Sequence, residues 1–140
     1  MKRMTSSLMM TVAAVTIAAG AASAQSYRAQ IPFAFSAGGK LMAPGVYQVK
    51  IETVHRLAIF SNFDAKQTVV AMSPSQDTPG KAMLAKGEPI VSFECGVGRC
   101  ALTRLWSGSG EPVLTFPAQG IGREEHASVT DIRLVPASAD

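Results

Sequence analysis

Residues 31–49 read IPFAFSAGGKLMAPGVYQV, and this stretch decides the fold class. Ile31, Phe33 and Phe35 alternate with smaller residues, which is the two-residue period of a half-buried strand. Pro44-Gly45 predicts a turn, because proline fixes φ and glycine tolerates positive φ. Another alternating apolar run follows at once from residue 46. The stretch therefore predicts a complete β-hairpin whose two strands lie on either side of the turn.

Short alternating runs continue along the chain, separated by glycine, proline, asparagine and aspartate. Strands are expected at about 31–36, 46–53, 57–61, 67–72, 89–95, 100–107, 112–117 and 128–135. Residues 25–30 read as a polar lead-in, 73–87 as a loop in which 81–86 forms a helical turn or a short edge strand, and 136–140 as a frayed tail. About seven or eight short strands without βαβ spacing predict an all-β fold, either an antiparallel sandwich or a small barrel.

Residues 1–24 have the features of a cleaved signal peptide. Lys2 and Arg3 precede an uncharged, alanine-rich apolar run, and Ala22-Ser23-Ala24 is an A-x-A cleavage site. A membrane anchor is the alternative, but the run is short and weakly apolar for a stable span. We expect a single all-β domain over residues 25–140, in the periplasm or outside the cell, with no stable membrane span after cleavage.

Cleavage also changes the charge of the chain. The sequence has thirteen lysines and arginines and ten acidic residues, and the signal segment removes two basic residues and no acidic ones. The mature chain therefore has a net charge of +1. Its arginines are scattered, so the sequence predicts no nucleic-acid partner.

Two stretches, IPFAFSAGGKLMAPGVYQV and IVSF…CALTRLWSGSGEPVLTFP, carry a resemblance. They are similar to the patterns PF-x-F…PAG-x-Y-x-V and …L-x-x-[IVL]-W… of a group of small secreted bacterial all-β proteins of unknown function. This chain departs from the pattern at Ala43-Pro44-Gly45, and its cysteine pair is not a feature of the group. The resemblance implies an all-β fold and export, and no activity.

Cys95 and Cys100 are the only cysteines, and they flank a glycine-rich turn. Opposed positions of a hairpin have Cα atoms close enough for a disulfide, and export places the chain where thiols oxidise. A redox-active pair normally has the spacing C-x-x-C at a helix N-terminus, and zinc needs four ligands. The spacing therefore predicts a structural disulfide and no metal site.

The sequence offers no convincing catalytic residues. His55 and His126 are the only histidines, and no G-x-S-x-G motif is present in the chain, including the Ser107–Gly110 turn. Glu124 and Glu125 are adjacent, so an extended chain points them to opposite faces, and Glu94 has no obvious partner. Gly38-Gly39 and Gly96-Val97-Gly98 open no helix and read as turns instead of phosphate sites. We predict a chain without catalytic residues or cofactors.

Phe60 and Phe63 are the aromatic residues that do not fit the predicted core. If Leu57 and Ile59 face inward, Phe60 faces outward, and Phe63 falls in a turn. The two rings either form an exposed binding patch or are covered by the second sheet, and the second option is favoured because large apolar residues are usually buried. Along 100–107, Leu102 and Trp106 are expected on one inward face.

These features predict an exported, non-catalytic β-sandwich module with a binding or structural role in the cell envelope. Its expected partner is an envelope protein or a glycan, contacted through loops or a sheet edge. One alternative is a small β-barrel that carries an apolar ligand. Another is a secreted hydrolase, which would need a histidine, an acid and a serine within hydrogen-bond reach.

Overall fold

The computed structural model describes residues 25–108, 110–118 and 128–137. The predicted signal segment and the Glu124–His126 region lie outside the described residues. The described residues form twelve strands and one short helix. Their bounds are β1 (Gln25–Ile31), β2 (Phe35–Ala37), β3 (Lys40–Met42), β4 (Gly45–Glu52), β5 (Leu57–Asn62), β6 (Gln67–Met72), β7 (Ser75–Asp77), α1 (Lys81–Lys86), β8 (Ile90–Gly96), β9 (Arg99–Trp106), β10 (Val113–Thr115), β11 (Ser128–Arg133) and β12 (Val135–Pro136).

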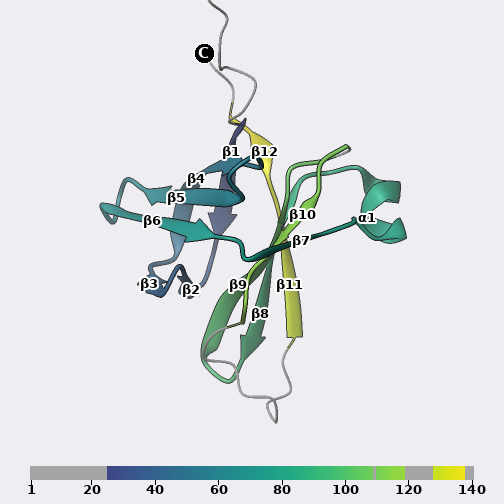
Figure 1. Cartoon of the computed structure of the whole chain (residues 1–140). Helices are drawn as coiled ribbons and strands as arrows, with labels where there is room; N and C mark the ends of the chain where they lie inside the picture. Colours follow the sequence, from purple (N-terminus) through teal and green to yellow (C-terminus); the bar gives the residue numbers. More distant parts are fainter. Residues whose placement is uncertain (1–24, 109, 119–127, 138–140) are drawn as a thin grey trace, which may run out of the picture.

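The strands form two sheets packed as a sandwich, which is not closed into a barrel. The five-stranded sheet has the order β12-β1-β4-β5-β6, and the seven-stranded sheet has the order β11-β8-β9-β10-β7 with β2 and β3 added beside β9. In Figure 1, β5 and β6 run across the view, whereas β8, β9 and β11 run down it. The all-β prediction is confirmed, and the strand number is higher than expected because several strands have only two or three residues.

The predicted hairpin over residues 31–49 is wrong in its pairing. β1 pairs with β4 up to Ile31 opposite Gly45, so the first strand ends where the prediction began it. Phe35 pairs instead with Met42 in the small β2–β3 hairpin, whose turn is at the two glycines. Residues 32–34 thus cross from one sheet to the other. The alternating residues Ile31 and Phe35, which were expected in one strand, belong to two different strands, β1 and β2.

Residues 25–30 are also not a lead-in. They form most of β1, in which Tyr27, Ala29 and Ile31 are buried and the residues between them face outward. The hydroxyl of Tyr27 donates a 3.0 Å hydrogen bond to the carbonyl oxygen of Ser107, which follows β9 in the other sheet. Burial raises the pKa of this phenol, and the nearby Glu111 carboxylate raises it further. At the other end of the chain, the expected tail of residues 136–140 begins with the second residue of β12, Pro136, which pairs with Tyr27.

The core between the sheets is centred on the ring of Phe35. Its centroid lies 5.2 Å from that of Tyr47 and 5.9 Å from that of Phe60, both in the five-stranded sheet. It also lies 5.0 Å from the ring of Phe93 in the seven-stranded sheet. All four side chains are fully buried. The interplanar angles of 60–68° around Phe35 are the edge-to-face arrangement that aromatic rings prefer.

The predicted face of residues 100–107 is interrupted by a β-bulge. The register between β8 and β9 shifts at Ser92 and Phe93, so Thr103 is an extra residue in β9. Leu102 and Leu105 therefore both belong to the core cluster. Trp106 is buried outside that cluster, and its Nε1 donates a 3.0 Å bond to the carbonyl oxygen of Glu111. The prediction that Trp106 shares the face of Leu102 is wrong because the bulge reverses the alternation.

The start of β4 depends on a close approach between Gly45 and Asn62. Gly45 has φ +152°, and a Cβ on it would lie 2.8 Å from Nδ2 of the Asn62 side chain. Asn62 is buried, and its Oδ1 accepts a 3.1 Å hydrogen bond from the amide of Ala65. Its Nδ2 donates a 3.5 Å hydrogen bond to the carbonyl oxygen of Pro44. Asn62 thus joins the start of β4 to the turn after β5.

We predict that Gly45→Ala lowers the free energy of unfolding more than Gly98→Ala. Both glycines have positive φ, but the space around a Cβ on Gly98 is open, whereas a Cβ on Gly45 meets Asn62. The pair therefore compares a glycine whose Cβ position is blocked by a neighbouring side chain with one whose Cβ position is open. Urea unfolding of the two variants measures the difference. Equal transition midpoints would show that the contact with Asn62 does not constrain the fold.

Candidate functional site

The favoured expectation, that the second sheet covers Phe60 and Phe63, is confirmed for Phe60 and wrong for Phe63, so the two rings form no shared patch. In β5 the buried positions are Ala58, Phe60 and Asn62, and Phe60 lies in the aromatic core. Phe63 lies in the turn between β5 and β6 with 71% of its surface exposed. The expectation that Leu57 and Ile59 face inward is wrong, because both alternating sets of β5 are apolar and the core takes the set that contains the larger ring.

This reversal places apolar side chains on the outer face of the five-stranded sheet. Leu57 pairs with Met72, and Ile59 pairs with Val70, in the register between β5 and β6. Met72 is 69% exposed and Val70 is 51% exposed, while the two β5 residues are half-buried. Cross-strand partners have Cβ atoms about 5 Å apart, so these four side chains are contiguous. We call them the outer apolar patch.

Polar residues border the outer apolar patch on its β4 side. Lys50 lies opposite Ile59, and Glu52 lies opposite Leu57. Toward the β5–β6 turn the next row across the sheet consists of Arg28, Gln48, Ser61 and Thr68. An apolar centre with a polar rim is the usual composition of a protein-contacting surface.

The β2–β3 turn covers part of the free edge of β6, next to the outer apolar patch. The Nζ of Lys40 donates a 3.4 Å bond to the carbonyl oxygen of Thr68. Gly38 lies so near that a Cβ on it would be 2.7 Å from the carbonyl oxygen of Val70. A lysine and a turn placed over an edge strand reduce its ability to pair with another chain. The exposed feature here is consequently the face of the sheet and not its edge.

A groove lies beside the outer apolar patch, where the β5–β6 turn meets the outer face of β1 and β4. Its volume is about 510 Å³. The residues that line it are Tyr27, Arg28, Val46, Tyr47, Gln48, Phe63, Asp64 and Ala137. Phe63, one of the two residues singled out in the sequence, thus has a place in a surface groove instead of in a patch with Phe60.

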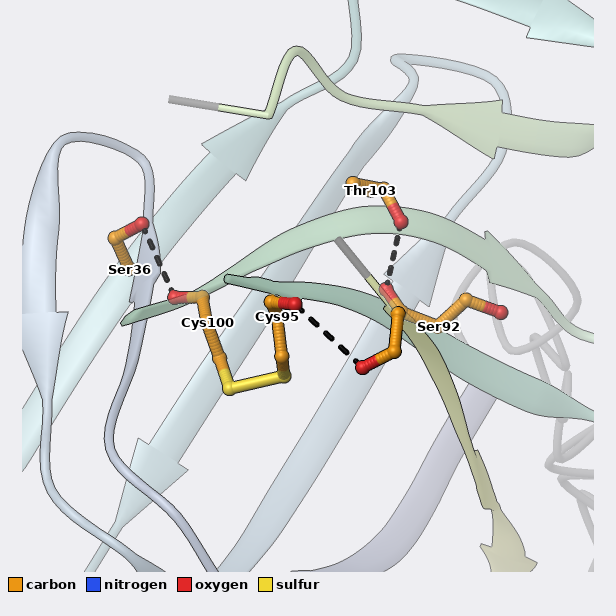
Figure 2. Close-up of a disulfide and its surroundings, with 6 residues drawn as sticks. Ser36, Ser92, Cys95, Cys100 and Thr103 are labelled. Carbon is orange, nitrogen blue, oxygen red and sulfur yellow. Dashed lines mark hydrogen bonds between the residues drawn. A yellow bond between two sulfur atoms is a disulfide. The ribbon is translucent and has the colours of Figure 1, made fainter. Parts of the chain in front are cut away.

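The disulfide between Cys95 and Cys100 is present at the tip of the β8–β9 hairpin. The two residues are directly opposed in the register, and their Cα atoms are 4.0 Å apart. Figure 2 shows the hydroxyl of Ser36 donating a 3.5 Å bond to the carbonyl oxygen of Cys100. The hydroxyl of Ser128 makes a bond of the same length to the carbonyl oxygen of Cys95. The bridged tip is therefore tied to both β2 and β11, as a structural element would be.

The remaining candidate residues are dispersed. The Nδ1 atom of His55 contacts Oε1 of Glu52 on the exposed β4–β5 turn. Glu94 is half-buried in β8, and His126, Glu124 and Glu125 lie outside the described residues. Ser107 is buried, and its Oγ has no hydrogen-bond partner among the residues that the structure describes.

Residues 25–108, 110–118 and 128–137 contain no group of three or more histidine, cysteine, aspartate or glutamate side chains placed to hold a metal ion. Over the same ranges, no helix has the length and apolar character needed to cross a membrane.

Comparisons with known proteins gave no match: no protein-family model, no curated protein and no solved structure matches this chain. The resemblance to small secreted bacterial proteins therefore stays a prediction. The residues that the sequence reasoning missed are Leu57, Ile59, Val70 and Met72. The available signal was that 57–60 and 69–72 are apolar in both alternating sets, which means that one set has to face outward in a two-layered fold.

We predict that replacing both cysteines with serine lowers the free energy of unfolding by about 2 kcal/mol, the chain-entropy value for so short a loop. Intact mass before and after reduction and alkylation first establishes the bond in the mature protein, and urea unfolding then gives the loss. Two thiols that alkylate without reduction, or an unchanged midpoint, would contradict a stabilising disulfide.

Proposed function

We propose that this chain is an exported, non-catalytic β-sandwich module of the cell envelope that docks a protein partner on the outer apolar patch. The observation that carries the proposal is the pair of registered contacts Leu57–Met72 and Ile59–Val70 on a solvent-facing sheet. One face of an antiparallel sheet normally packs on the core while the other is polar. Four contiguous apolar side chains on the outer face are an exception that a partner would explain.

The shape of the outer apolar patch supports a protein over a small molecule. Its residues lie on the face of two paired strands, whereas small-molecule sites are concave and enclose most of the ligand. Lys50 and Glu52 carry opposite charges at its border, and Glu52 also contacts His55. Such rim charges mainly influence the orientation and rate of association, and the apolar centre supplies the affinity.

The two alternative functions have less support. A carrier of an apolar ligand needs an internal cavity, but the space between the sheets is occupied by fully buried side chains that include Phe35, Tyr47 and Phe60. A hydrolase of the serine type needs a serine hydroxyl bonded to a histidine. Among the described residues, the ring of His55 bonds to Glu52 and to no serine.

We predict site-specific capture of one envelope protein through the outer apolar patch. A photo-reactive amino acid replaces Met72 in one variant and Val129 in another, and each is crosslinked in cells of the source organism. Val129 is the matched control because it is 60% exposed in β11 of the other sheet. Position 72 should yield one dominant adduct that position 129 does not, and the captured protein, once purified, should bind the mature chain directly.

A charge placed in the outer apolar patch should weaken that binding. Val70→Glu is expected to reduce affinity for the purified partner by at least about tenfold while leaving thermal melting nearly unchanged, because the position is exposed. His55→Gln should leave affinity unchanged. Equal crosslinking at positions 72 and 129, or undiminished binding by Val70→Glu, would refute the proposal. A loss of partner binding in His55→Gln would move the binding site to the β4–β5 turn.

A further inference from the structure

The groove beside the outer apolar patch has a chemistry of its own. Arg28 lies opposite Gln48, and Gln30 lies opposite Val46, in the register between β1 and β4. Arg28, Val46 and Gln48 therefore project from the outer face of the sheet, at the foot of the β5–β6 turn. Phe63 and Asp64 line the same groove from that turn. One wall is thus a sheet face and the other is a turn.

The polar side chains of the groove have no structural task that the fold requires. Arg28, Gln48 and Asp64 make no side-chain hydrogen bond or ion pair to any other described residue. Phe63 is largely exposed, and Val46 beside it is 47% exposed. Because Phe63 lies outside the core cluster, removing its ring should cost little folding stability. The groove therefore combines free hydrogen-bonding groups with an exposed aromatic surface.

We propose that this groove binds a neutral oligosaccharide. A sugar ring has an apolar face of C–H groups that can pack on Phe63 and Val46, and a rim of hydroxyls that donate and accept hydrogen bonds. The side chains present match that rim, because the Arg28 guanidinium only donates, the Asp64 carboxylate only accepts, and the Gln48 amide does both. The charges of Arg28 and Asp64 cancel, so the groove should favour a ligand without net charge.

The size of the groove agrees with this ligand class. A volume of about 510 Å³ lies within the range of about 300–1,000 Å³ that is typical of small-ligand clefts. The inference does not use the residues of the outer apolar patch, and thus it stands independently of the proposed protein docking.

Calorimetric titration of the mature chain with four tetrasaccharides tests the proposal. Maltotetraose, cellotetraose and chitotetraose are neutral probes, and tetragalacturonate is the acidic one. At least one neutral probe should bind, and more tightly than the acidic one. Phe63→Ala should weaken that binding by at least about tenfold, the loss expected when an aromatic contact surface is removed. Leu84→Ala, at a half-exposed position in α1, is the control and should leave binding unchanged.

Three results would overturn the proposal: no heat with any neutral probe, binding that survives Phe63→Ala, or preference for tetragalacturonate. Thermal melting of Phe63→Ala shows that the variant is folded, since its side chain contributes little to the core. The crosslinked adduct at Met72 is measured separately. If that adduct forms while no saccharide binds, the glycan proposal is refuted and the docking proposal stands.

Discussion

The packing of the Phe35 ring between the two sheets is the contact on which the rest of the structure depends. Phe35 belongs to the short β2–β3 hairpin, and its ring contacts Tyr47 and Phe60 from one sheet and Phe93 from the other. The same hairpin pairs with β9 through Ser36 opposite Ala101, and its turn lies against β6. A single hairpin therefore fills the centre of the core, extends one sheet and covers an edge of the other.

The packing of the core also determines what the molecule presents to solvent. Strand β5 carries apolar residues in both alternating sets, and only one set can face the core. Because Phe60 fits beside Phe35 and Tyr47, Leu57 and Ile59 are left on the outer face, next to Val70 and Met72. The outer apolar patch thus exists because Phe60 occupies the aromatic core. A substitution in β5 affects folding if the residue faces the core, and it affects partner binding if the residue faces outward.

The sequence was sufficient for the all-β fold class and the disulfide, because each follows from local spacing. It left Lys81–Lys86 open between a helical turn and a short edge strand, and the structure shows the helix. It was insufficient where both alternating sets of side chains in a strand are apolar, so that either could face the core, and where a bulge interrupts the alternation. β1 was missed because its outward residues are polar and only Tyr27 and Ala29 mark the inward face before Ile31. The crossing before Phe35 leaves no local signal, and the bulge at Thr103 reverses the face of Trp106. Of the candidate site, only Phe63 was identified from the sequence. The outer apolar patch was not, because its position depends on which alternating set of β5 side chains faces the core.

A double-mutant cycle between Phe35 and Phe93 tests the central role of the aromatic cluster most directly. Phe35→Leu and Phe93→Leu keep the positions apolar, and urea unfolding gives the free energy of each single and double variant. The ring contact predicts a coupling energy of about 1 kcal/mol between the two positions. The control cycle pairs Phe35→Leu with Val113→Ala, a buried position outside the core cluster, and should be additive within about 0.5 kcal/mol. Additive losses at Phe35 and Phe93 would show that Phe35 does not join the two sheets.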